Sequence, residues 1–227
     1  MVFDEACQLP CWWGIRPGES SLEATLSHLH SLSFQVFDSA ASMQGEDDFL
    51  VFLEFQAEAD VIRSIEVGGD YATGTVEETA RRDAFARGWQ DYSVKAMIAN
   101  YGLPSRIALY APFQADPGGP RFRLYLFYET LGFVAQYRGD AEQVNGARYR
   151  ACLDLVNMST VELFLYQPGA VDSIVEYILP SSALSFLGEP ELVYDLVDWE
   201  HATGTSLESL ATSLTSSSEP VCVEFSN

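Results

Sequence analysis

Apolar residues alternate with other residues in several short segments of the chain, and this period of two limits the fold more than any other feature. Residues 49–55 (FLVFLEF) alternate in this way, and residues 61–67 (VIRSIEV) do so after the short connection AEAD. Alternation places apolar side chains on one face of a β-strand, and a short connection favours an antiparallel hairpin. The sequence therefore predicts antiparallel β-structure.

The second half of the chain repeats the strand pattern. Its strand-like segments are RFRLYLFYE, FVAQY, ARYRACLDL, VELFLYQP and the closing VCVEF. The turn-forming pair Asn145-Gly146 precedes the third of these segments. Residues 38–48 (DSAASMQGEDD) are polar and interrupt the pattern in the first half, before residues 49–55.

Helices are predicted where apolar residues recur every three or four positions. Residues 20–32 open with Ser20 three positions before Glu23, which is typical of a capping box. Residues 92–101 and 206–214 show the same spacing, and Ser206 is the expected cap of the latter. The predicted fold class is α+β, with antiparallel sheets and short amphipathic helices packed on one face.

Two segments place a glycine, one other residue and a proline after a helical pattern. Gly102 and Pro104 follow residues 92–101, and Gly188 and Pro190 follow the segment SALSFL. Glycine readily adopts the left-handed conformation common at helix ends, and proline cannot continue a helix. We therefore predict that Gly102 and Gly188 occupy equivalent helix ends in two repeated units.

Glycines and mixed charges in residues 68–91 indicate a boundary between two halves of the chain. We expect a first α+β unit over residues 1–75 and a linker or helix over residues 76–91. A second α+β unit follows over residues 92–227, with a partial third repeat from about residue 180.

The charge balance is strongly acidic, with 12 Lys and Arg against 33 Asp and Glu and a formal net charge of −21. Binding to nucleic acid or to an anionic membrane needs a basic surface, so both partners are disfavoured. No apolar stretch approaches the roughly 18 residues of a membrane span. The opening MVFDEACQLP lacks the regions of a signal peptide, so the protein either stays inside the cell or is a mature or trimmed form.

The four cysteines are Cys7, Cys11, Cys152 and Cys222. Their spacing offers one close pair without a nearby histidine, which disfavours zinc. An even number suits two disulfides in an oxidising compartment, and three pairings are open. Cys7 with Cys11 could close locally, and Cys152 with Cys222 would then tie the last strand to the second unit. An extracellular or envelope location is expected; reduced cysteines in the cytoplasm are the alternative.

Aromatic residues supply two candidate contact surfaces. Trp12 and Trp13 are adjacent and should face opposite sides of an extended chain, so one of them is a candidate contact for a partner. A second series could line a ligand groove, although its strand period favours division between core and surface. Its members are Phe122, Tyr125, Phe127, Tyr128, Phe133 and Tyr137.

Signals of catalysis, metal binding or cofactor binding are weak. The histidines are His28, His30 and His201, and we place the first two on a helix and the last in a loop. The acidic loops GEDD and QADPGG lack the ligand spacing of an EF-hand. The common nucleotide, esterase and metalloprotease motifs do not occur, so we assign no catalytic, metal or cofactor residue.

The opening CQLPCWWGIRPGES and the order helix, Gly-x-Pro, strand, long alternating strand, Gly, strand resemble the SmpA/OmlA-like family of small outer-membrane lipoproteins. The opening also looks like uncharacterised bacterial exported proteins in which such units occur in tandem. The resemblance implies two helices on a three-stranded antiparallel sheet in each unit, and a binding or scaffolding role without catalysis.

Three functions are open at this point. The first is a noncatalytic binding or assembly module of the bacterial envelope or exterior, whose partner is another protein. The second is a small-ligand-binding protein that uses the aromatic sheet face. The third is a hydrolase whose carboxylates are brought together only by the fold, and a deep pocket with two facing acids would favour it.

Overall fold

The computed structural model describes residues 7–44, 50–71, 77–110, 119–169 and 197–226. Its α-helices are α1 (Leu22–Ser31), α2 (Glu78–Gly88), α3 (Val94–Tyr101), α5 (Trp199–Thr203) and α6 (Leu207–Ser216). Its strands are β1 (Gln35–Val36), β2 (Ala40–Gln44), β3 (Leu50–Glu58), β4 (Val61–Asp70), β5 (Arg106–Tyr110), β6 (Arg121–Tyr128), β7 (Phe133–Asp140), β8 (Glu142–Asn145), β9 (Arg148–Cys152), β10 (Met158–Tyr166), β11 (Val197–Asp198) and β12 (Cys222–Ser226). The predicted α+β class is confirmed.

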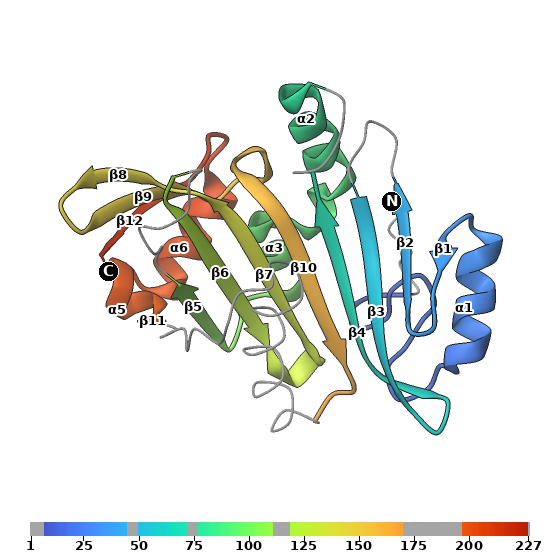
Figure 1. Cartoon of the computed structure of the whole chain (residues 1–227). Helices are drawn as coiled ribbons and strands as arrows, with labels where there is room; N and C mark the ends of the chain where they lie inside the picture. The colour runs from blue at the N-terminus through green and yellow to red at the C-terminus, as the bar shows by residue number, and fades with distance from the viewer. Residues whose placement is uncertain (1–6, 45–49, 72–76, 111–118, 170–196, 227) are drawn as a thin grey trace.

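Nine strands form one sheet in the order β1-β2-β3-β4-β10-β7-β6-β5-β11, and each neighbouring pair is antiparallel (Figure 1). Strands β8, β9 and β12 form a smaller antiparallel sheet. The pairing of β4 with β10 joins the two halves of the chain in the large sheet. The division into repeated units stays a prediction, and residues 78–88 of the expected linker or helix form α2.

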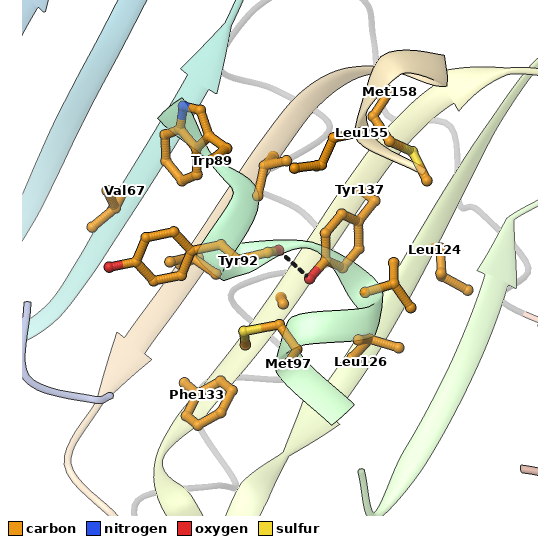
Figure 2. Close-up of a cluster of buried hydrophobic side chains, with 14 of the residues drawn as sticks. Val67, Trp89, Tyr92, Met97, Leu124, Leu126, Phe133, Tyr137, Leu155 and Met158 are labelled. Atoms are coloured by element: carbon orange, nitrogen blue, oxygen red, sulfur yellow. Dashed lines mark hydrogen bonds between the residues drawn. The ribbon is translucent and has the colours of Figure 1, made fainter. Parts of the chain in front are cut away.

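One face of the large sheet, which we call the helix face, carries the main core. In Figure 1, α3 and α6 lie behind the strands on the same side of the sheet. Figure 2 shows Trp89, Tyr92 and Met97 packed against strand side chains that include Val67 and Tyr137. The Tyr137 hydroxyl donates a hydrogen bond of 2.8 Å to the carbonyl of Tyr92, which satisfies the buried phenol.

Two adjacent glycines of β4 let aromatic rings lie directly against the strand, one on each face. A Cβ atom added at Gly69 would lie 2.3 Å from the Trp89 ring, and one added at Gly68 would lie 1.9 Å from the Phe52 ring. Consecutive strand residues face opposite sides, so the two rings cover opposite faces of the sheet. The opposite side, beneath the Phe52 ring, is called the second face below.

Two local features differ from the sequence pattern. Part of residues 38–48, where the polar run interrupts the alternation, is strand β2, which pairs with β3 and buries Ala41 in the core. Small residues pack there without an obvious alternating pattern. The α1 cap is Ser21 instead of Ser20: the Ser21 Oγ accepts from the N–H of Ala24 at 3.2 Å. The Ser20 Oγ accepts instead from the N–H of Arg16.

Gly102 ends α3 with φ 78° and ψ −164°, and its N–H donates to the carbonyl of Ile98 at 3.0 Å. The positive φ fits the expected glycine cap, but this ψ differs from the left-handed helical conformation that we expected. Side chains other than glycine rarely adopt this extended region of positive φ. Pro104 is buried two residues later. Gly188 and Pro190 lie outside the described residues, so the comparison of the two helix ends stays a prediction.

Replacing Gly102 by valine is expected to lower the free energy of unfolding by about 1–3 kcal/mol. A Cβ at this position has no heavy atom within 4 Å, so the loss comes from backbone strain instead of a clash. Urea denaturation measures the change. Leu103→Val, at the exposed neighbouring residue, is the matched control and should change stability little.

A second variant, Gly102→Asn, tests the unusual ψ. Asparagine tolerates the left-handed helical region but gains nothing in the extended region of positive φ. Gly102→Asn should therefore destabilise the protein about as much as Gly102→Ala, a variant that also lacks the conformational freedom of glycine. A neutral Gly102→Asn would contradict the conformation described for this helix end.

Candidate functional site

The second face of the large sheet carries three rows of side chains that run across six strands, from β3 through β4, β10, β7 and β6 to β5. The Glu66 row contains Glu54, Glu66, Phe164, Val134, Phe127 and Arg106. The central row contains Phe52, Gly68, Glu162, Gln136, Tyr125 and Ala108. The arginine row contains Leu50, Asp70, Thr160, Arg138, Arg123 and Tyr110.

Polar groups are buried in the middle of this face. Glu66 and Glu162 are each 8% exposed, and Gln136 is 3% exposed. They lie among a second hydrophobic cluster, every member of which is on a strand: Ala108, Tyr125, Phe127, Val134, Phe164 and Tyr166. Carboxyl and amide groups are normally exposed unless they are paired, so this placement is unusual for the residue types.

Register explains how the two acids meet. Glu66 pairs with Phe164 across β4 and β10, and Glu162 pairs with Gly68. Glu66 and Glu162 are therefore diagonal neighbours on one face, a separation that long side chains can span. Neither acid is near the other in sequence, so the pairing of β4 with β10 creates the site.

Only one of the two polar atoms of the Gln136 side chain has a hydrogen-bond partner within the described chain. Its Nε2 donates a hydrogen bond to Oε2 of Glu162, its neighbour on β10. Its Oε1 is buried and has no hydrogen-bond partner within the described stretches of chain. A buried acceptor in this condition costs about 1–3 kcal/mol, so the site favours a group that donates a hydrogen bond at this atom.

Both carboxyl groups hold their protons more tightly than an exposed glutamate does. Burial raises the pKa of Glu66 to about 8, helped by the charges of Glu162 and Glu54. Burial also raises the pKa of Glu162 to about 7, although Arg123 and Arg138 oppose this rise. At neutral pH the site therefore holds a mostly protonated Glu66 beside a partly ionised Glu162.

This arrangement can exchange protons and can bind hydrogen-bond donors. A neutral carboxylic acid donates one hydrogen bond and accepts others, and an ionised one attracts a cation. The rings of Tyr125 and Phe127 stack with centroids 6.2 Å apart, and the Arg106 guanidinium lies 4.0 Å from the centre of the Phe127 ring. The described residues contain no group of three or more metal-ligating side chains that could hold an ion.

The predicted cysteine sites lie outside these rows. Cys7 is bonded to Cys11, and Cys152 is bonded to Cys222, so one of the three open pairings is observed. Cys152 and Cys222 are register partners on β9 and β12, with their Cα atoms 3.9 Å apart. Both disulfides are consistent with the expected oxidising compartment. The bond between Cys152 and Cys222 links two paired strands of the smaller sheet.

The expected opposite orientation of the two tryptophans was wrong. Trp12 and Trp13 stack on each other with centroids 4.6 Å apart. Trp13 has φ 51°, so the chain turns between them instead of running extended. Trp12 is buried, and the partly buried Trp13 meets Phe34 edge-on at 5.5 Å. Both rings thus pack against the core near the N-terminus. A partner contact through Trp13 stays a prediction.

The aromatic series of the second half is also placed differently from our expectation. All six of its members are buried instead of being divided between core and surface. Tyr125 and Phe127 lie in the second-face cluster, and the other four lie in the main core: Phe122, Tyr128, Phe133 and Tyr137. The strand period was correct, but the face expected to meet solvent is buried as well.

His28 and His30 are exposed on α1, as expected for surface residues of a helix. His201 is exposed on the short helix α5, so its placement in a loop was wrong. The Asp198 side chain caps this helix by accepting from the N–H of Glu200 at 3.0 Å.

Sequence reasoning missed Glu66, Gln136 and Glu162. A usable signal was present, because two of them interrupt apolar runs: Glu162 within VELFLY and Gln136 within FVAQY. Strands that are apolar on both faces are buried on both faces, so a polar residue inside such a run is a candidate buried group.

No family model, curated protein or solved structure matches the chain. In the described stretches, the helices are too short or too polar to cross a membrane.

Proposed function

We propose that this protein is a noncatalytic binding module that holds a small ligand on the second face of its large sheet, among the Glu66 row and the central row. The observation that carries the proposal is the buried Gln136 Oε1 without a hydrogen-bond partner in the described chain, set among aromatic side chains. Binding sites for small molecules combine an apolar surround with a few converging polar groups.

The wider setting is proposed with it. Two disulfides and a net charge of −21 fit a protein of the bacterial envelope or exterior that also contacts another protein. Tandem SmpA/OmlA-like units, divided near residues 76–91, remain the proposed origin of the fold. The binding or scaffolding role that this resemblance implies agrees with the proposed ligand site.

Hydrolysis is the weaker alternative. Acid–base catalysis by two carboxyl groups uses environments that push the two pKa values apart, so that one group is ionised while the other is protonated. Here burial raises both values, to about 8 and about 7. Neither carboxyl group is therefore held firmly ionised at neutral pH, as the nucleophile or base of a hydrolase would be.

Benzyl alcohol is a suitable neutral probe, because its ring matches the aromatic cluster and its hydroxyl can donate to Gln136 Oε1. We expect saturable shifts of backbone amide signals from β6, β7 and β10 in a two-dimensional NMR titration. Gln136→Met removes the acceptor at similar side-chain size and should weaken binding at least about tenfold, the value of one well-placed hydrogen bond to a buried group.

The matched control is Gln143→Met, at an exposed glutamine of β8 outside the three rows. It should leave the titration unchanged. Shifts scattered over the surface, or equal binding by the two variants, would contradict the proposed site.

A further inference from the structure

We propose that the ligand of this site is an organic amine, bound as its ammonium form over the diagonal pair Glu66 and Glu162, next to Gln136, with its apolar part against the neighbouring aromatic side chains. This inference rests on the proposed function and specifies the chemical class of its ligand. An ammonium group supplies hydrogen-bond donors and a positive charge, and the site has an acceptor and a carboxyl group that can use both.

Glu66 is the carboxyl group best placed to receive the charge. The groups that raise its pKa besides burial are the carboxylates of Glu162 and Glu54. Glu162, in contrast, is influenced by the guanidinium groups of Arg123 and Arg138 and accepts from Gln136. A cation therefore gains more at Glu66, where negative groups gather, than on the arginine side of Glu162.

The amide of Gln136 fixes which kind of group can enter. Its Nε2 already donates to Glu162, and its Oε1 is the atom without a partner in the described chain. That atom is an acceptor, so it selects a donor such as an ammonium or a hydroxyl group and disfavours a carboxylate or a phosphate. The amide and the neighbouring carboxyl groups of Glu162 and Glu66 thus select a cation together.

Aromatic side chains lie next to the polar groups of the proposed amine site. Phe164 is the register partner of Glu66, and Tyr125 is the register partner of Gln136. Phe127, in the Glu66 row, already has the Arg106 guanidinium 4.0 Å from its ring centre, which is within the range of a cation–π contact. Aromatic faces next to carboxyl groups therefore suit both the charge and the hydrocarbon of an amine.

Binding of a cation would be linked to loss of a proton. The free site holds a proton on Glu66, whose pKa is about 8, and the bound ammonium favours the ionised carboxylate. Each amine bound below pH 8 thus releases up to one proton from Glu66 to solvent, and the amine keeps its own. Affinity should rise roughly tenfold per pH unit from pH 6 and level off above pH 8.

Other charged or titratable groups on this face set the background of the pH dependence. On β3 and β4 they are Glu54 and Asp70, on β10 Glu162 and Tyr166, on β7 Arg138 and Asp140, on β6 Arg121, Arg123 and Tyr125, and on β5 Arg106 and Tyr110. Glu162 has a pKa of about 7, so it contributes to the same pH range. Glu66→Gln separates the two contributions.

Calorimetric titration with benzylamine, benzyl alcohol and benzoate tests the inference, because the three probes share a ring and differ in the polar group. Benzylamine should bind at least about tenfold more tightly than benzyl alcohol at pH 8, and benzoate should be the weakest. Repeating the benzylamine titration at pH 6.5 in buffers of different ionisation enthalpy should reveal release of about one proton. Glu66→Gln should abolish the preference for the amine and reduce the proton release.

Glu142→Gln, which makes the same substitution at an exposed glutamate of β8, is the control and should bind like the wild type. Equal affinity for the alcohol and the amine, or amine binding without proton release, would overturn the amine inference and leave the proposed binding site standing. Binding of none of the three probes would overturn both.

Discussion

Replacing Glu66 by glutamine is expected to raise the free energy of unfolding at pH 8.5 by on the order of 3 to 5 kcal/mol, and to leave it nearly unchanged at pH 4. Burial, together with Glu162 and Glu54, raises the pKa of this carboxyl group from 4.5 to about 8. The folded protein then binds the proton more tightly than the unfolded chain. Stability from this group is present below pH 4.5 and is lost as the pH rises to about 8.

Glutamine keeps the shape of the side chain and cannot ionise, so the variant escapes this loss. Urea denaturation at a series of pH values measures the difference between the two proteins. The exposed variant Glu142→Gln corrects for the change in net charge and should show little effect. An equal gain from both substitutions, or a Glu66→Gln gain that does not grow with pH, would contradict the buried, protonated Glu66.

Removing the disulfide between Cys152 and Cys222 by replacing both residues with alanine is expected to lower the free energy of unfolding by about 4 kcal/mol. The bond joins residues with a sequence separation of 70, so its loss increases the conformational entropy of the unfolded chain. It also holds β12 on β9, where Phe225 stacks with Tyr149 in the core.

The bond between Cys7 and Cys11 is the internal comparison, because its sequence separation is only 4 residues. The corresponding double alanine variant should lose about 2 kcal/mol on the same entropic argument. Urea denaturation of both variants without reducing agent measures the two losses. A larger loss for the short bond than for the long one would count against the described roles of the two disulfides.

The strand pattern predicted the fold class because alternation is a local property. Residues 49–55 and 61–67 alternate and are joined by a short connection, and they form the hairpin of β3 and β4. Helix α3 was predicted from the three- and four-residue spacing of its apolar side chains and from Gly102 at its end, which are also local properties. Strand β2 was missed, because the small side chains of Ala40–Gln44 carry little apolar contrast and depend on β3 for their place in the sheet.

The candidate site could not be predicted in the same way. Glu66 and Glu162 meet because β4 pairs with β10, and sequence periodicity does not specify which distant strands become neighbours. Alternation also implied an exposed second face. The continuous apolar character around Glu162 was the local sign that both faces of β10 are buried.

The central claim is that Glu66 keeps a proton near neutral pH and gives it up when an amine binds. A carbon-13 NMR titration of the Glu66 carboxyl signal, assigned with Glu66→Gln and recorded with and without saturating benzylamine, tests it most directly. The account predicts a midpoint near pH 8 in the free protein and a clearly lower midpoint with benzylamine. A free-protein midpoint near 4.5, or a midpoint that benzylamine leaves unchanged, would contradict it.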